Sequence, residues 1–392
     1  MVPRTRRLGI SLAILAMSAS AVAACSSSGS SSGGTSSSGG TSSAAGSQAA
    51  NAEGGPSAAA IAEAKAELAK YAPTTDPVIV PEKLNKPPRK GVKFTLISCS
   101  VPACTSFAQQ AAVVAKALGW SINVVNEGVT PQTIISAFKQ VDANPGDAVM
   151  DIGLLPIASY YPYVQKLPTN VPFVLVAPGE DTTPYPRIGF VASGPNEIEL
   201  QGRVMADWVV ADSGGQPIHA ADVEDPTLTG VLPTVTSFTA RIKELCPACT
   251  SDNIPVSVAK NNAIAPTVVN YMESHSDTNY LVSELGSLLN GVPAALNQAG
   301  IHVKITARAE DAANLGDIQA GLMTSVITSE VNENPWMAMG GVAMLLNGQK
   351  PDPIDPIGVF HLITKDNLPA DTSQVYTVPG YEQTFLKAFD LK

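Results

Sequence analysis

The chain has 392 residues and a formal net charge of −10, with 24 Lys and Arg residues against 34 Asp and Glu residues. This length is enough for two domains of ordinary size. The acidic balance and the lack of a basic stripe argue against a nucleic-acid-binding protein, because a negative surface repels phosphate.

The N-terminus has the pattern of a secretory signal. Arg4, Arg6 and Arg7 precede an apolar run at 8–24, which ends in small residues before Cys25. A positive segment followed by such a run is typical of a signal peptide covering 1–24. An uncleaved membrane anchor is the alternative, for which the run is short.

The residues Val-Ala-Ala-Cys at 22–25 resemble a bacterial lipobox. The resemblance implies that Cys25 becomes the first residue and carries lipid on its sulfur together with a further acyl chain such as palmitate. The mature lipoprotein would then be held on the outer face of the cytoplasmic membrane, in the cell envelope, because several acyl chains anchor stably.

Two segments separate this anchor from the main body. Residues 25–56 contain Ser, Gly and Ala with almost nothing else after Cys25, so we expect a disordered tether. Residues 57–91 form the lead-in to the main body. We expect a helix at 57–71 and an extended Pro-rich stretch up to residue 91.

From residue 92 onward, β-prone apolar runs alternate with amphipathic helices. In the first unit, apolar residues at 111, 114, 115 and 118 recur at helical spacing and Gly119 ends the helix. We predict strands at 94–98, 122–126, 148–152, 173–177, 188–191, 218–223, 255–259, 280–283, 302–307, 324–328 and 357–363. We predict helices at 106–118, 131–143, 157–166, 195–211, 235–245, 265–274, 287–299, 315–320, 336–346 and 382–389. This α/β order predicts parallel sheets that bind ligands at the carboxyl ends of their strands.

Five segments in this order carry a specific likeness. They are Pro-Pro-Arg-Lys-Gly-Val-Lys-Phe-Thr-Leu-Ile-Ser (87–98), Ala-Lys-Ala-Leu-Gly-Trp (115–120), Val-Pro-Phe-Val (171–174), Phe-Thr-Ala-Arg-Ile-Lys-Glu-Leu-Cys (238–246) and Gly-Leu-Met-Thr-Ser-Val (321–326). From 92 to 392 the chain resembles the type I periplasmic solute-binding family, which includes the sugar-binding components of bacterial ABC importers.

The resemblance implies two Rossmann-like lobes with parallel sheets, joined by three crossover hinges near Phe190, Ser329 and Gly358. The N-terminal lobe would comprise 92–190 with 330–357, and the C-terminal lobe 191–329 with 358–392. It also implies a non-enzymatic receptor without a cofactor, which closes on a small-molecule ligand and delivers it to an ABC permease.

Positions that hold sugar hydroxyls in such relatives are not polar here. The chain has Val-Pro-Ala-Cys at 101–104 where relatives often carry Asn-Pro and two aromatics, and Leu-Gly at 285–286 in place of Asn-Asp. A buried hydroxyl without a partner costs about 1–3 kcal/mol. Four or five of them would remove micromolar binding, which is worth about 8 kcal/mol.

We therefore expect a small, rather apolar ligand, and a sugar or polyol held by other polar groups stays open as the alternative. The expected ligand-binding residues are Val101, Ala103, Ala177, Leu228, Val231, Leu285, Arg308, Glu330 and Trp336. Trp336, Tyr160, Tyr161 and Tyr163 either stack on the ligand or belong to the core.

Besides Cys25 the chain has four cysteines, Cys99, Cys104, Cys246 and Cys249. An even count outside the cytoplasm predicts two disulfides, and of the three possible connectivities we expect the local pairs 99–104 and 246–249. The Cys-Pro-Ala-Cys motif at 246–249 also makes a thiol oxidoreductase an alternative function. Such enzymes place this motif at the start of a helix, whereas here it follows one.

Other chemistries find little support in the sequence. The four histidines are scattered, and the chain has neither GxSxG nor a glycine-rich phosphate loop. A zinc site would need both distant cysteine pairs, so we expect no metal site and no catalytic residues. A cell-surface protein that uses this fold for sensing or protein contacts remains the alternative of another class.

Overall fold

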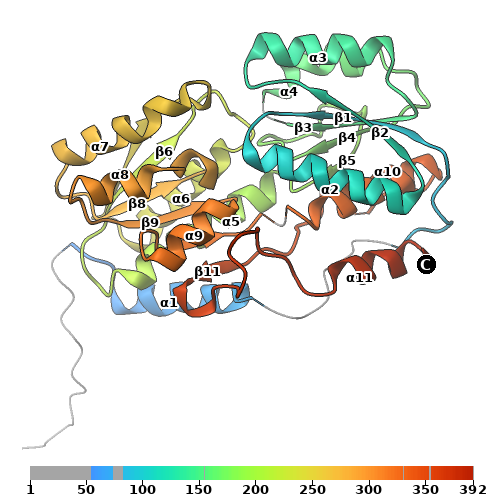
Figure 1. The fold of residues 1–392 in the computed structure, drawn as a ribbon. Coiled ribbons are helices and arrows are strands. Elements are labelled where there is room, and N and C mark those ends of the chain that lie inside the picture. The colour runs from blue at the N-terminus through green and yellow to red at the C-terminus, as the bar shows by residue number, and fades with distance from the viewer. Residues whose placement is uncertain (1–53, 74–82, 154, 330, 353–354, 392) are drawn as a thin grey trace, which may run out of the picture. The chain divides into compact units, whose positions relative to one another are not determined.

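The computed structural model describes residues 54–73, 83–153, 155–329, 331–352 and 355–391, all within one compact unit (Figure 1). The expected signal peptide, Cys25 and nearly all of the tether lie outside the described residues, as does Glu330. Among the described helices, none is both long enough and apolar enough to cross a membrane.

The first lobe is built on a five-stranded parallel sheet in the order β2-β1-β3-β4-β5. Its strands are β1 (Lys93–Ser98), β2 (Ser121–Asn126), β3 (Ala148–Ile152), β4 (Phe173–Val176) and β5 (Ile188–Ala192). Its helices are α2 (Pro102–Leu118), α3 (Pro131–Ala143), α4 (Ile157–Val164) and α10 (Asn334–Leu346). Helices α3 and α4 lie on one side of this sheet, and α2 and α10 lie on the other (Figure 1).

The second lobe is built on a six-stranded sheet in the order β11-β10-β9-β8-β6-β7. Its parallel strands are β6 (His219–Glu224), β7 (Thr250–Pro255), β8 (Tyr280–Ser283), β9 (Lys304–Arg308) and β10 (Ser325–Ile327), and β11 (Leu362–Thr364) is antiparallel. Its helices are α5 (Pro195–Asp212), α6 (Leu232–Leu245), α7 (Ile264–Ser274), α8 (Val292–Gln298) and α9 (Ala312–Ala320).

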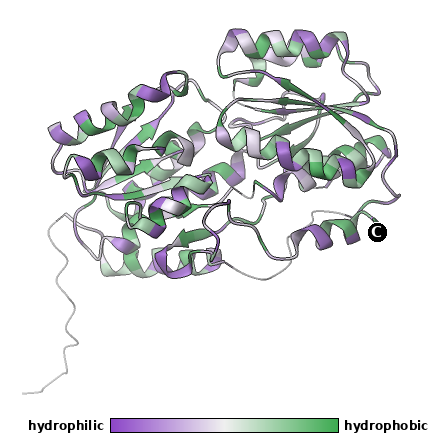
Figure 2. Cartoon of the chain, viewed as in Figure 1, coloured by the Kyte–Doolittle hydropathy of each residue, from purple (hydrophilic) through white to green (hydrophobic). Residues whose placement is uncertain are grey.

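The hydropathy pattern explains these layers. Strands β3, β4 and β8 are buried along their whole length, as expected for parallel strands covered on both faces. Helix α3 instead mixes hydrophobic and hydrophilic residues, and the residues that it buries are Ile134, Ala137, Phe138 and Val141 (Figure 2). Apolar residues at this spacing form one stripe that faces the sheet.

Between β1 and β11, the chain passes from one lobe to the other three times. The chain leaves the first lobe after β5 and enters α5, returns after β10 to α10, and then crosses again to β11. The buried carboxylate of Glu197 joins two of these passages, since it accepts hydrogen bonds from Ser193 Oγ (2.7 Å) and from the backbone N–H of Gly358 (2.6 Å). The first crossing therefore begins at Ser193, just after the expected position of Phe190.

The C-terminal helix does not belong to the lobe to which the sequence assigned it. Helix α11 (Tyr381–Ala388) packs on the first lobe, where the rings of Phe385 and Trp336 lie 5.7 Å apart. Tyr381 also accepts a hydrogen bond from Gln110 of α2 (2.8 Å). The assignment of all of 358–392 to the second lobe was therefore wrong. The chain crosses once more after β11 because the apolar face of α11 is buried against α10.

Helix α1 (Ala58–Leu68) is part of the second lobe rather than a free lead-in. Its buried residues Ala60 and Ala64 join a core that includes Trp208 of α5 and Phe238 of α6. Its Glu63 also pairs with Arg241 of α6 (2.8 Å). The chain that would lead to the predicted anchor thus departs from the second lobe.

Three elements differ from the sequence prediction. Of the strand expected at 357–363, only the end is found, in β11. The strand expected at 255–259 was wrong, because β7 runs from Thr250 to Pro255 and a 3-10 turn follows at Val258–Ala263. This edge strand buries only Ile254 and so lacks an apolar run. The helix expected at 287–299 is divided by Gly291, whose φ of 82° separates a 3-10 turn, Gly286–Leu289, from α8.

Candidate functional site

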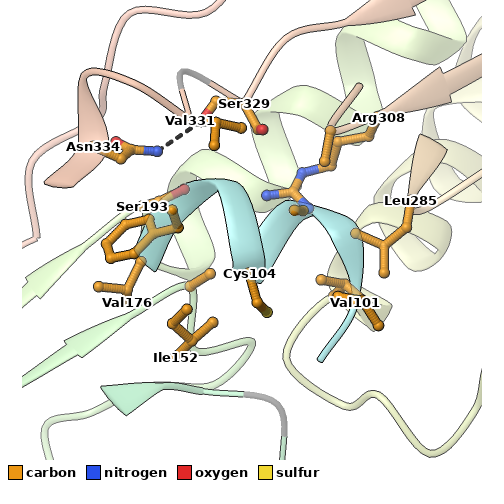
Figure 3. Close-up of a pocket in the computed structure, with 15 residues that line it drawn as sticks. Val101, Cys104, Ile152, Val176, Ser193, Leu285, Arg308, Ser329, Val331 and Asn334 are labelled. Carbon is orange, nitrogen blue, oxygen red and sulfur yellow. Dashed lines mark hydrogen bonds between the residues drawn. The ribbon is translucent and has the colours of Figure 1, made fainter. Parts of the chain in front are cut away.

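A cavity of about 90 Å³ lies between the lobes, at the carboxyl ends of their strands (Figure 3). Its wall draws on both sheets and on the passages between them. The lining residues are Val101, Ala103, Cys104, Phe107, Ile152, Val176, Ala177, Ser193, Val231, Leu285, Arg308, Ala309, Ser329, Val331 and Asn334. This is the crevice in which open α/β folds bind ligands.

Three non-glycine residues with a positive φ, which is a strained backbone conformation, line this cavity. Ala177, Ser193 and Ala309 have φ values of 53°, 53° and 54°, and each directly follows a strand. Only one other non-glycine residue in the described chain, Asp390, has a positive φ. Such residues cost about 1–3 kcal/mol each and concentrate at ligand sites. The backbone therefore marks the same place as the cavity.

Most of the wall is apolar. Eleven of the fifteen lining residues carry no polar side chain apart from the sulfur of Cys104. The sulfur of Cys104 is joined to Cys99, which ties the first turn of α2 to the end of β1. Val101 directly precedes α2, Ile152 ends β3 and Val176 ends β4, and Leu285 faces them from the second lobe (Figure 3).

The polar side chains of the wall lie together on the opposite side of the cavity. Figure 3 shows Ser193, Ser329, Asn334 and Arg308 across from Val101, Cys104 and Ile152. Asn334 donates to the backbone oxygen of Ser329 (2.7 Å), and its Oδ1 is buried without a hydrogen-bond partner among the described residues. The cavity is thus two-sided, with a polar side formed mainly by the passages between lobes and an apolar side formed mainly by the first lobe.

Arg308 is the one charged residue in the described wall. It ends β9, is 3% exposed, and donates from Nε to Oε1 of Gln201 on α5. Burial lowers the pKa of Arg308 to about 10, and the nearby Glu197, Glu284 and Glu310 act in the opposite direction. Its guanidinium therefore remains positively charged at neutral pH.

Six of the nine residues expected to bind the ligand are in this wall. They are Val101, Ala103, Ala177, Val231, Leu285 and Arg308. Leu228 is buried elsewhere and does not line the cavity, and Glu330 lies outside the described residues.

Trp336 is also not brought to the cavity. It is 1% exposed and packs against Phe385 and Phe389 of the C-terminal segment. Trp336 therefore belongs to the core and not to the cavity wall. The tyrosines lie away from the cavity as well. Tyr160 stacks on Phe138 with ring centroids 4.6 Å apart, and Tyr161 meets Tyr185 edge-on. No aromatic platform beyond Phe107 faces the cavity in the described part of the chain.

Sequence reasoning missed the polar side of the site. Ser193, Ser329 and Asn334 lie in or beside the segments that cross between the lobes, and none of them is among the ligand-binding residues expected from the sequence. Ser193 follows the fifth strand directly, so the rule that strand ends carry the site would have selected it. Asn334 opens α10 and reaches the cavity only because the second passage folds back between the lobes.

The second cysteine pair does not lie at the start of a helix, where thiol oxidoreductases place this motif. Cys246 and Cys249 are joined in a disulfide, and both are 1% exposed. Cys246 follows the last turn of α6, so no helix N-terminus is available to lower a thiol pKa. Among the described residues, no group of three or more His, Cys, Asp or Glu side chains could hold a metal ion.

A second polar cluster lies inside the first lobe. Glu127 and Asp151 are buried beside each other, and Glu127 Oε1, Asp151 Oδ1 and the Tyr160 hydroxyl have no hydrogen-bond partner among the described residues. Burial, more than any other cause, raises the pKa of both carboxyls, and Asp151 adds to the rise at Glu127. These groups therefore favour the protonated form in the folded protein.

This cluster predicts that stability falls as pH rises. An unfolded carboxyl releases its proton near pH 4, so above that pH the folded state binds more protons than the unfolded state. We expect Asp151→Asn to raise the free energy of unfolding at about pH 8 by about 1–3 kcal/mol relative to its effect at about pH 5. Urea unfolding at both pH values measures this. Glu199→Gln, at an exposed position on α5, is the control; an equal pH response of both variants would contradict the assignment.

Comparison with solved structures shows the fold. A glucose-galactose binding protein from Geobacillus stearothermophilus, GanP, matches at 17% identity with a TM-score of 0.62, over 72% of this chain and 100% of its own. An ABC transporter solute-binding protein from Agrobacterium vitis, bound to α-D-tagatopyranose, matches at 16% identity with a TM-score of 0.64, over 73% of this chain and 99% of its own.

A structure described as a putative LacI transcriptional regulator from Bacteroides fragilis also matches, at 13% identity with a TM-score of 0.60, over 71% of this chain and 98% of its own. No protein-family model and no curated protein matches the sequence. The chain therefore has the two-lobed fold of type I periplasmic solute-binding proteins, with two largely parallel sheets, as predicted.

Proposed function

We propose that the protein is a non-enzymatic solute receptor that closes its two lobes on a small molecule. The observation that carries the proposal is the cavity between the lobes, where three residues with strained backbone follow three different strands. Closure works by population shift: a ligand that contacts both lobes binds the closed state more tightly and so favours it.

The comparisons and the cavity wall favour different ligands. Structures that match are described in complex with α-D-tagatopyranose, allitol and D-arabinose, which supports a sugar or polyol receptor better than the apolar ligand expected from the sequence. The wall itself presents few polar side chains, with Arg308, Ser193, Ser329 and Asn334 as the groups that would hold hydroxyls. A sugar would have to make its hydrogen bonds on this side alone.

Location and partners are part of the proposal. The lipobox at 22–25 supports a lipid anchor on Cys25 at the outer face of the cytoplasmic membrane, and the Ser- and Gly-rich tether would separate the receptor from that surface. Two disulfides fit an oxidising compartment. The matching structures named as ABC transporter components support delivery of the ligand to an ABC permease.

Native mass spectrometry of the freshly purified protein tests the receptor function. We expect one small molecule to be retained per chain and released on unfolding, and its identification fixes the ligand class. A chain that retains nothing, and that binds no sugar, polyol or apolar compound in calorimetry, would contradict the proposal.

A further inference from the structure

The bonding of Arg308 leaves most of its guanidinium unused. Only its Nε donates a hydrogen bond within the described chain, and the acceptor is the neutral amide of Gln201. Neither Nη group forms an ion pair or donates a hydrogen bond to another described residue. Guanidinium groups donate through five N–H bonds, so the side of Arg308 that borders the cavity still has donors to offer.

The carboxyls around Arg308 are engaged elsewhere or favour the neutral form. Glu197 accepts from Ser193 Oγ, Gln201 Nε2 and the N–H of Gly358, and burial raises its pKa. Burial also raises the pKa of Glu284 well above its ordinary value, and Glu284 accepts from the N–H of Asp225 (2.8 Å). Glu310 accepts from the N–H of Ser329 (3.0 Å). Neither Glu197 nor Glu284 forms an ion pair with Arg308, and a buried cation without a paired anion is costly.

The rest of the cavity wall restricts the chemistry of an anionic ligand. Across from Arg308 the wall consists of Val101, Ile152 and Val176, none of which can accept or donate a hydrogen bond through its side chain (Figure 3). A second polar group at that end of a ligand would be buried without a partner, at a cost of about 1–3 kcal/mol. The small volume further requires a short molecule.

We propose that the ligand is a short monocarboxylate with an apolar tail, whose carboxylate accepts hydrogen bonds from the Nη groups of Arg308 and whose tail lies against Val101, Ile152 and Val176. This inference rests on the proposed receptor function and names its ligand class. Carboxylates match the fork of a guanidinium in geometry as well as in charge.

Matched pairs of acids and amides test this directly. Propionate, isovalerate and benzoate are titrated into the purified protein by calorimetry beside propionamide, isovaleramide and benzamide, with D-arabinose and xylitol as the polyhydroxyl probes. Each amide nearly matches its acid in shape but lacks the charge. We expect at least one acid to bind about tenfold or more tightly than its amide, because hydrogen bonds to a charged group are about twice as strong.

Substitution of the arginine provides the second readout. We expect Arg308→Gln to remove the preference for acid over amide while leaving amide binding in place. The control Arg203→Gln changes an exposed arginine on α5 that pairs with Glu244 and should leave the preference intact. If Arg308→Gln does not fold, the acid and amide comparison on the unchanged protein decides alone.

The outcomes separate the inference from the function beneath it. Tighter binding of D-arabinose or xylitol than of any acid, or equal binding of every acid and its amide, would contradict the proposal of a monocarboxylate ligand. Neither result would contradict the proposed receptor function. If no molecule is retained in native mass spectrometry and none of the acids, amides or polyhydroxyl probes binds, the receptor function is contradicted as well.

Discussion

Gly230→Ala is expected to hold the lobes apart and to weaken ligand binding about 10- to 100-fold. A Cβ atom at Gly230 would lie 2.0 Å from the carbonyl oxygen of Gly153 and 3.0 Å from that of Ala177. The three nearest atoms all belong to the first lobe, whereas Gly230 belongs to the second. The methyl group would therefore oppose closure and not the folding of its own lobe.

A second glycine makes the same contact from the other side. A Cβ atom at Gly179 would lie 2.4 Å from the carbonyl oxygen of Thr229. Backbone thus meets backbone across the mouth of the cavity, which requires residues without side chains on both lobes. Calorimetry with the retained ligand measures the effect of Gly230→Ala, and thermal unfolding checks that the variant is folded.

The matched control is Gly316→Ala in α9, where the added methyl would meet no atom within 4 Å. We expect its affinity to equal that of the unchanged protein, with a small gain in stability from the better helix former. Unaltered affinity in Gly230→Ala would show that the contact between Gly230 and Gly153 has no part in ligand binding.

Arg241→Met is expected to lower the free energy of unfolding by about 3–5 kcal/mol. The side chain of Arg241 is 6% exposed, and its guanidinium pairs with Asp207 (2.8 Å), Glu63 (2.8 Å) and Glu244 (2.8 Å). Asp207 is itself buried, and burial raises its pKa to about 6 even with Arg241 beside it. Without the arginine, that carboxylate is left buried and unpaired between α5 and α6.

Urea unfolding measures this loss, and two further variants locate its cause. Arg203→Met removes an exposed arginine that also pairs with Glu244, and exposed pairs contribute about 0–1 kcal/mol, so we expect little change. Adding Asp207→Leu to Arg241→Met should restore part of the lost stability because the unpaired charge is gone. If both arginine variants cost the same, burial of the Arg241 pair is not the cause.

Local patterns in the sequence predicted the α/β order, and the reason is physical. Parallel strands buried on both faces read as apolar runs such as 148–152, and the helices between them bury one stripe, as at Ile134, Ala137 and Val141. The edge strand β7 has no buried run, and the split at Gly291 depends on a positive φ that the local pattern did not reveal.

Part of the candidate site was accessible to the same reasoning. Val101, Ala177 and Arg308 end or follow strands, so the rule for strand ends places each of them at the carboxyl edge of its own sheet. Ser329 and Asn334 belong to a passage between lobes, and their position depends on how two distant segments pack. The prediction that Trp336 binds the ligand was wrong for the same reason, because the ring it packs against, that of Phe385, is 49 residues away in the chain.

The distance between the lobes reports closure itself. Spin labels at Ser159 in the first lobe and Pro226 in the second, both exposed, flank the contact between Gly153 and Gly230. In the purified protein, we expect saturating ligand to shorten and narrow the measured distance distribution, and Gly230→Ala to prevent this change. A distribution that is the same with and without a bound ligand would contradict closure of the lobes.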